Sequence, residues 1–124
     1  MAWSQRPFTR LDRSKIDRQA QALQLPVHDA AGVLPVPCSQ ASVIVIDIQA
    51  EVTEFSFQDL AVYGDVLLTI RMTGAQTVAW TGVDKWDGRA VPTLTADGED
   101  HVLIWDAGGT VYGKQVGTDV GAPE

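Results

Sequence analysis

The side chains of this 124-residue chain that could perform chemistry are few, and their spacing does not suit catalysis. A nucleophile needs a base within hydrogen-bonding reach. The single cysteine, Cys38, lies ten residues from His28 and stands directly after Pro37. We therefore interpret Cys38 as an unreactive, partly buried thiol. One cysteine cannot form an internal disulfide, and with only two histidines the sequence predicts no zinc site.

Acidic residues form three small groups. The first is Asp97, Glu99 and Asp100, which His101 follows directly. The second is Asp84 with Asp87, and the third is Asp47 with Glu51 and Glu54. A calcium loop places oxygen ligands at alternate positions, whereas Gly98 interrupts the first group, so a solvated turn is the better interpretation. The second group ends in Asp87-Gly88, which is typical of a turn. The third could supply two carboxylates for glycoside cleavage, but no run of aromatic residues surrounds it. The sequence predicts no enzymatic activity, metal or cofactor.

Charge is divided unevenly along the chain, whose net charge is −7. Residues 1–18 hold five basic and two acidic residues, a balance of +3, and the remainder holds four basic and 14 acidic residues, a balance of −10. An acidic body repels nucleic acid, so we predict no nucleic-acid partner. No glycine-rich phosphate-binding motif is present, so we predict no nucleotide chemistry. The basic residues Arg6, Arg10, Arg13 and Arg18 could contact an acidic neighbour. A solvated terminus is the alternative.

Hydropathy predicts neither membrane insertion nor secretion. No apolar run approaches the ~20 residues that span a bilayer. The N-terminal sequence MAWSQRPFTR lacks the apolar segment of a signal peptide. We therefore expect a protein that is made and assembled in the cytoplasm.

Residues 1–40 differ in character from the rest of the chain. Residues 14–25 could form a short amphipathic helix that ends before Pro26, because a residue before proline avoids the α conformation. Pro35 and Pro37 then predict an extended segment, suited to a sheet edge or to an arm that lies over a neighbouring subunit. We interpret residues 1–40 as an attachment arm.

From residue 41 the pattern changes to short, β-branched segments separated by turns. Strands are predicted at residues 42–49, 52–57, 60–63, 66–73, 77–81, 92–95, 101–106 and 110–115. Asp106-Ala107-Gly108-Gly109 predicts a hairpin between the last two. No helix-length pattern separates the strands, so antiparallel pairing is expected. The predicted fold is all-β, a small antiparallel sandwich or barrel of the jelly-roll kind over residues 41–117, preceded by the arm and followed by a loose tail at residues 118–124.

Four aromatic residues near the C-terminus could form a core, an interface or a carbohydrate platform. Trp80 and Trp105 lie in apolar segments, so we predict that both are in the core. Trp86 lies in a polar loop and is the better candidate for an exposed contact, together with Tyr112.

Several short elements in this region follow one another in a recognisable order. They are Val78-Ala79-Trp80, Trp86-Asp87-Gly88, Pro92-Thr93-Leu94-Thr95, Gly98 with Asp100, Val102-Leu103-Ile104-Trp105, Asp106 with Gly108-Gly109, and Tyr112-Gly113. This order resembles a module at the C-terminal end of many bacteriophage tail-fibre and virion-appendage proteins. The resemblance covers about residues 66–113. That family usually has a Trp-Pro-Gly turn, or a similar one, where this chain has Trp86-Asp87-Gly88.

The resemblance implies a virion structural protein without enzymatic activity, commonly a homotrimer, that is assembled in the host cytoplasm. Its expected partners are other virion proteins of the tail or capsid, and a host-surface glycan is a further candidate. Oligomerisation would also cover the edges of a small β domain. A capsid decoration protein, or head fibre, is the alternative that the short chain favours. A carbohydrate-binding module based on Trp86 and Tyr112 is a further alternative.

Overall fold

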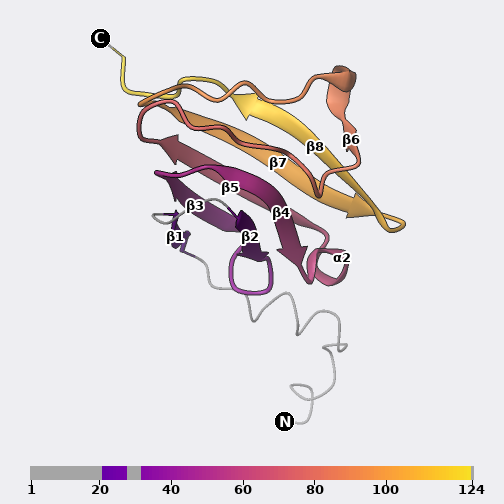
Figure 1. Cartoon of the computed structure of the whole chain (residues 1–124). Coiled ribbons are helices and arrows are strands. Elements are labelled where there is room, and N and C mark those ends of the chain that lie inside the picture. Colours follow the sequence, from indigo (N-terminus) through magenta and orange to yellow (C-terminus); the bar gives the residue numbers. More distant parts are fainter. Residues whose placement is uncertain (1–20, 28–31, 124) are drawn as a thin grey trace.

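Two β-sheets form the body of the computed structural model, which describes residues 21–27 and 32–123 (Figure 1). The larger sheet has six strands in the spatial order β1 (Leu23–Val27), β3 (Val43–Ile48), β5 (Asp65–Met72), β7 (Glu99–Ala107), β8 (Thr110–Gly117) and β6 (Lys85–Trp86). The second sheet pairs β2 (Gly32–Pro37) with β4 (Val52–Gln58). Among the described residues, helical structure is limited to one turn at α2 (Leu60–Tyr63) and a 3-10 turn at η2 (Asp87–Arg89). The prediction of a β fold is confirmed.

The first five strands alternate between the two sheets. β1, β3 and β5 are parallel neighbours in the large sheet, and β2 and β4 are parallel neighbours in the small one. The prediction of antiparallel pairing is therefore wrong for this half of the molecule. Parallel strands need a long crossover, which a helix usually supplies, and here a strand of the opposite sheet supplies it. Among the strands that the structure describes, only the pairs β5–β7 and β7–β8 are antiparallel.

The boundary predicted at residue 40 is wrong, because strands β1 and β2 belong to the two sheets. Leu34, Val36 and Cys38 are buried in the main core. Residues 23–25, expected at the end of a helix, lie in β1 instead, where Leu23 and Leu25 pack against the core. The apolar residues of this segment therefore contribute to the body. The remainder of the predicted helix lies outside the described residues.

The core lies between the sheets. Strands β3, β5 and β7 turn alternate residues toward it, as the two-residue period of a strand requires. The buried set includes Ile44, Ile46 and Ile48 from β3, Leu68 and Ile70 from β5, and Val102 and Ile104 from β7. Leu34, Val36, Val52 and Phe55 cover them from the small sheet. Cys38, predicted to be partly buried, is fully buried, and its Sγ donates to the Val36 carbonyl oxygen at 3.5 Å.

Two predicted strands in the middle of the chain are replaced by other structures. Residues 60–63 form the helical turn α2, which follows Asp59 in the left-handed conformation. Residues 92–95 form no strand. Residues 77–81 do run beside β4, with backbone hydrogen bonds from Val52 N to Thr77 O (3.0 Å) and from Phe55 N to Thr81 O (2.7 Å). This segment therefore protects one edge of the small sheet.

The predicted hairpin between β7 and β8 is confirmed. Gly108 and Gly109 have φ angles of 64° and 89°, a conformation that favours glycine. The Asp106 carboxylate accepts a hydrogen bond from Gly109 N at 3.0 Å, which stabilises the turn. The tail is attached more firmly than predicted, since Val120 N donates to Glu99 O at 2.7 Å.

Candidate functional site

The β7–β8 hairpin has two faces of different chemistry. One face is directed into the core and the other away from it. We use the name open face for the outward side of β5, β7 and β8, which carries Asp65, Leu67, Thr69, Arg71, Glu99, His101, Leu103, Trp105, Tyr112 and Lys114. Register, burial and the contacts below assign these residues to one side of the sheet.

The two predicted contact residues lie on different sides of this hairpin. In the register of β6 with β8, Trp86 is opposite Gly113, and Tyr112 is opposite Lys85. The Trp86 ring lies over Gly113 so closely that a Cβ at Gly113 would overlap it. Trp86 and Tyr112 therefore do not form one contact surface.

Trp86 is packed against the core. Its ring meets Trp80 edge to face, with centroids 5.2 Å apart, and Trp80 stacks on Phe55 at 4.5 Å. Trp80 is 8% exposed, which confirms its predicted core position. Edge-to-face and offset-stacked pairs are the favoured geometries of aromatic rings. Trp86 thus links the short edge strand β6 to the core.

Trp105, predicted to be in the core, is half-buried on the open face instead. It stacks on Tyr112 of the neighbouring strand, with centroids 5.6 Å apart and planes inclined by 11°. The two residues are directly opposite in the register of β7 with β8. Sequence alone placed Trp105 wrongly because β7 is apolar on both faces, so hydropathy does not distinguish them.

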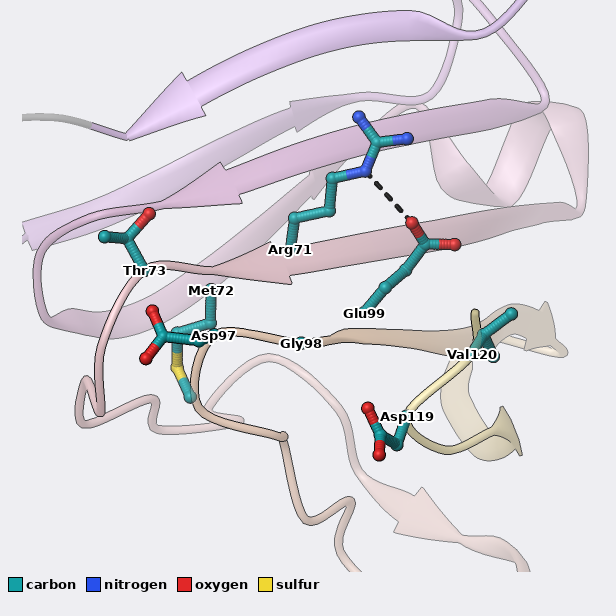
Figure 2. Close-up of a pocket in the computed structure, with 8 residues that line it drawn as sticks. All are labelled: Arg71, Met72, Thr73, Asp97, Gly98, Glu99, Asp119 and Val120. Carbon is teal, nitrogen blue, oxygen red and sulfur yellow. Dashed lines mark hydrogen bonds and ion pairs between the residues drawn. The ribbon is translucent and has the colours of Figure 1, made fainter. Parts of the chain in front are cut away.

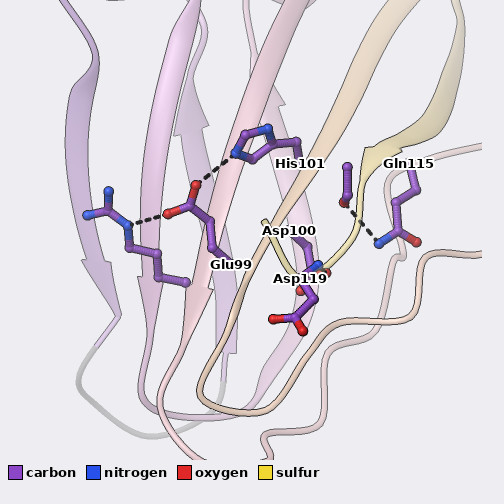
Figure 3. Close-up of polar contacts among 7 residues, drawn as sticks. Glu99, Asp100, His101, Gln115 and Asp119 are labelled. Atoms are coloured by element: carbon purple, nitrogen blue, oxygen red, sulfur yellow. Dashed lines mark hydrogen bonds and ion pairs between the residues drawn. The ribbon is translucent and has the colours of Figure 1, made fainter. Parts of the chain in front are cut away.

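The first acidic group is divided by the alternation of β7 (Figure 3). Asp100 points inward and is fully buried. Its carboxylate accepts hydrogen bonds from Thr95 N (2.6 Å), Thr95 Oγ1 (3.0 Å) and Asp119 N (3.0 Å). Three donors satisfy this buried group, so Asp100 fastens the long loop and the C-terminal segment to β7. Sequence reasoning missed this role, since Thr95 and Asp119 approach Asp100 only in the folded chain.

Glu99 and His101 point the other way, onto the open face. Glu99 accepts hydrogen bonds from Arg71 Nε at 3.0 Å and pairs with His101 Nε2 at 2.9 Å. The hydrogen bond from His101, followed by that from Arg71, lowers the pKa of the Glu99 carboxyl below its ordinary value. Arg71, Glu99 and His101 thus form a small cluster of paired polar side chains, here called the charge group, at one end of the open face.

A shallow hollow of about 410 Å³ adjoins this charge group (Figure 2). Asp97 and Asp119 lie along its rim, and Asp97 Oδ1 accepts a hydrogen bond from Gly74 N at 2.8 Å. Within residues 21–27 and 32–123, no group of three or more histidine, cysteine or acidic residues has a geometry that could hold a metal ion. The hollow is therefore a polar surface feature in which the described residues offer no metal-binding set.

A second hollow, of about 550 Å³, is lined by Asp84, Lys85, Trp86 and Arg89. Its charges are mixed, and Asp84 is held by a hydrogen bond from Val111 N at 2.8 Å. The exposed edge of Trp86 could accept a planar or apolar group here. If the protein is a carbohydrate-binding module, the alternative given above, this hollow beside Trp86 is where a sugar would bind.

The remaining predicted residues do not converge. Asp47 lies on the large sheet and Glu54 on the small one, so the carboxylate group with Glu51 does not face one cleft. Arg6, Arg10, Arg13, Arg18 and His28 lie outside the described residues. Pro35 and Pro37 lie in β2, at the edge of the small sheet. In the part of the chain that the structure describes, no helix has the length and apolar character needed to cross a membrane.

Comparison with known proteins finds no relative: no family model, no curated protein and no solved structure matches this chain.

Proposed function

We propose that this chain is a structural subunit of a bacteriophage virion, in a tail fibre or tail-tip appendage, that acts through assembly and has no catalytic role. The observation that supports this most is the way in which the recurring sequence elements meet. Trp80 and Trp86 contact each other, Trp86 lies on Gly113, and Asp100 holds Thr95. Elements that are distant in sequence thus form one structural unit.

This arrangement explains the residue types in the resemblance. Gly113 has no side chain because the Trp86 ring occupies that space. Asp100 accepts from both the backbone and the hydroxyl of Thr95. These residues of the pattern have roles in packing or hydrogen bonding. The pattern therefore describes how the fold is built and includes no group that would react with a substrate. An architecture without a reacting group suits a protein that builds a particle.

A capsid decoration protein, or head fibre, is the second candidate. The observation in its favour is that the described residues form a two-sheet body and no extended fibre shaft. In either location the partners would be other virion proteins and further copies of the chain, with a homotrimer as the expected assembly. The carbohydrate-binding alternative would use the hollow beside Trp86 to contact a host-surface glycan.

The test is to locate the protein on particles. Antibodies raised against the purified chain would be applied, with gold labels, to intact phage particles from a culture that carries the gene. Labels at the tail end are expected, and labels over the capsid would indicate the decoration alternative. If purified particles contain none of the protein by mass spectrometry, the virion proposal is wrong.

Glycan binding is tested separately by array. Binding that Trp86→Phe retains and Trp86→Ala removes would assign a sugar to this hollow, since phenylalanine keeps an aromatic face. The Trp105→Ala variant is the control, because Trp105 lies on the other side of the sheet. Binding lost equally in both variants would point to a general loss of structure.

A further inference from the structure

Positive charge in the acidic body gathers at one edge of the large sheet. After residue 18 the chain has four basic residues, and three of them are Lys85, Arg89 and Lys114. Lys85 lies in the edge strand β6, Arg89 in η2, and Lys114 on the neighbouring strand β8 (Figure 1). These three and the acidic Asp84 and Asp87 give this edge a balance of +1. The rest of the chain after residue 18 has one basic and 12 acidic residues, a balance of −11.

Two of these cations border the hollow of about 550 Å³ beside Trp86. Lys85 and Arg89 both line this hollow, and both residues are exposed. Lys114 is engaged elsewhere, since its Nζ lies 4.0 Å from an oxygen of Asp87. No described residue forms an ion pair with Lys85 or with Arg89. The hollow therefore has two positive charges that the described part of the chain does not neutralise by direct contact.

The walls of the hollow are held in place by the fold. The Trp86 ring packs edge to face against Trp80 and lies over the backbone of Gly113. Asp84 is attached to β8 by two hydrogen bonds of 2.8 Å, one from its backbone N to Val111 O and one from Val111 N to its Oδ2. The hollow is thus formed before a ligand arrives, which lowers the entropic cost of binding.

Arg89 is positioned by an unusual backbone conformation. Its φ of 61° lies in the left-handed region, directly after Gly88 at 65°, and residues other than glycine seldom adopt this conformation. The turn is closed by a hydrogen bond of 3.2 Å from Ala90 N to Asp87 O. Backbone strain of this kind is found most often at functional sites. In this turn the strained residue is one of the two cations that line the hollow.

The side chains of the hollow indicate the chemistry of its ligand. The exposed part of Trp86 offers an apolar surface to the C–H groups of a sugar ring. Lys85 and Arg89 offer charged donors to a carboxylate. Asp84 Oδ1 accepts no hydrogen bond from the described residues, so it can accept one from a sugar hydroxyl.

We propose that this hollow binds an acidic saccharide, one whose sugar rings carry carboxylates. A neutral sugar would leave the two cations unused, and a simple inorganic anion would leave the aromatic surface unused. The inference rests on the carbohydrate alternative given under the proposed function and specifies the class of sugar. It does not depend on where the protein lies in a particle.

The test compares two probes that differ only in charge, the dimer of galacturonic acid and its dimethyl ester. NMR titration of the ¹⁵N-labelled full-length chain measures weak affinities and also locates the site. At ~0.15 M salt the Debye length of ~8 Å screens the distant acidic residues. We expect the acid dimer to bind at least about tenfold more tightly than the ester, because only the acid pairs with Lys85 and Arg89. The largest chemical-shift changes should be at the Trp86 indole N–H and the Arg89 amide.

Charge-removing variants test the two cations separately. Lys85→Gln and Arg89→Gln should each weaken binding of the acid dimer by about threefold or more and leave binding of the ester unchanged. Glutamine at a positive φ is as strained as arginine, so Arg89→Gln alters the charge and not the backbone cost. Arg71→Gln is the matched control, because the Arg71 side chain is 53% exposed, lies on the open face and pairs with Glu99. It should leave both affinities unchanged, and circular dichroism melts would establish that every variant folds.

Four outcomes would overturn the proposal. The first is no binding of the acid dimer up to about 10 mM. The second is equal affinity for the acid and the ester, a comparison that needs no variant. The third is a loss of affinity in Arg71→Gln as large as that in Arg89→Gln. The fourth is displacement of the dimer by an equal concentration of inorganic phosphate, which would make the hollow a simple anion site.

The basic N-terminal residues are the rival location for an acidic ligand. Chemical-shift changes confined to residues 1–18 would assign the dimer to them and reject the hollow. This inference and the virion proposal can fail separately. A chain that is found on particles but does not bind the dimer would reject this inference alone, and a chain that binds the dimer but is absent from particles would reject only the virion proposal.

Discussion

Strand β7 has two sides that differ in burial and in contacts, because successive residues point to opposite faces of the sheet. On the inner side, Asp100, Val102 and Ile104 are fully buried and every polar contact is satisfied. On the outer side, Glu99, His101 and Trp105 are half-buried and contact only their neighbours on the same face. The inner side holds the domain together. The outer side makes no comparable contact with the core.

The largest expected effect is on the inner side. Asp100→Ala should lower the free energy of unfolding by about 3 kcal/mol, because it leaves the donors of Thr95 and Asp119 without their acceptor. Chemical denaturation of both proteins measures this difference. Asp87→Ala, at an exposed carboxylate, is the control and should change the free energy by no more than about 0.5 kcal/mol. Equal effects at the two sites would mean that the hydrogen bonds to Asp100 do not hold the domain together.

The tryptophans test the same contrast with one residue type. Trp86→Ala should lower the free energy of unfolding by about 2.5 kcal/mol, since it removes the contacts with Trp80 and leaves a cavity above Gly113. Trp105→Ala should cost about 1 kcal/mol, because only its stack with Tyr112 is lost. Thermal and denaturant unfolding of the two variants would rank them. The reverse ranking would mean that the outer aromatic pair is the structural one.

Gly113 offers a third comparison. Gly113→Ala should destabilise the fold by about 2 kcal/mol, since the new methyl group must displace the Trp86 ring. The emission spectrum of tryptophan should change with it. Gly32→Ala is the matched control, because a Cβ at that strand position meets nothing within 4 Å. If Gly113→Ala leaves the free energy of unfolding unchanged, the Trp86 ring can move aside without destabilising the fold.

The smallest effect concerns the charge group on the open face. Because the folded-state pKa of Glu99 is lowered by His101 and Arg71, its contribution to stability is present above the ordinary glutamate pKa and is lost as the pH falls through the lowered value. Glu99→Gln should therefore cost about 0.5 kcal/mol at neutral pH. Its stability should converge with that of the wild type in acid. A difference that persists at low pH would contradict this origin.

Local sequence signals predicted much of the fold. Alternating β-branched residues placed β3, β4, β5, β7 and β8, and Gly108-Gly109 placed the hairpin. The pairing of β1 and β2 could not be predicted in this way, since each is short and interrupted by proline. Their places depend on partners that lie 20 residues or so further along, such as Ile44 for Leu23 and Phe55 for Leu34. Periodicity contains no information about which strand pairs with which.

The sequence by itself determined the β class, the hairpin and the core position of Trp80, because these depend on residue type and local alternation. Tertiary structure alone decided the interleaved parallel strands and the roles of the aromatic residues. Trp86, in a polar loop, is drawn onto the core by the space at Gly113, and Trp105, in an apolar strand, is turned outward by the register that buries Ile104. A one-residue difference in register reverses such an assignment, and only the folded sheet specifies the register.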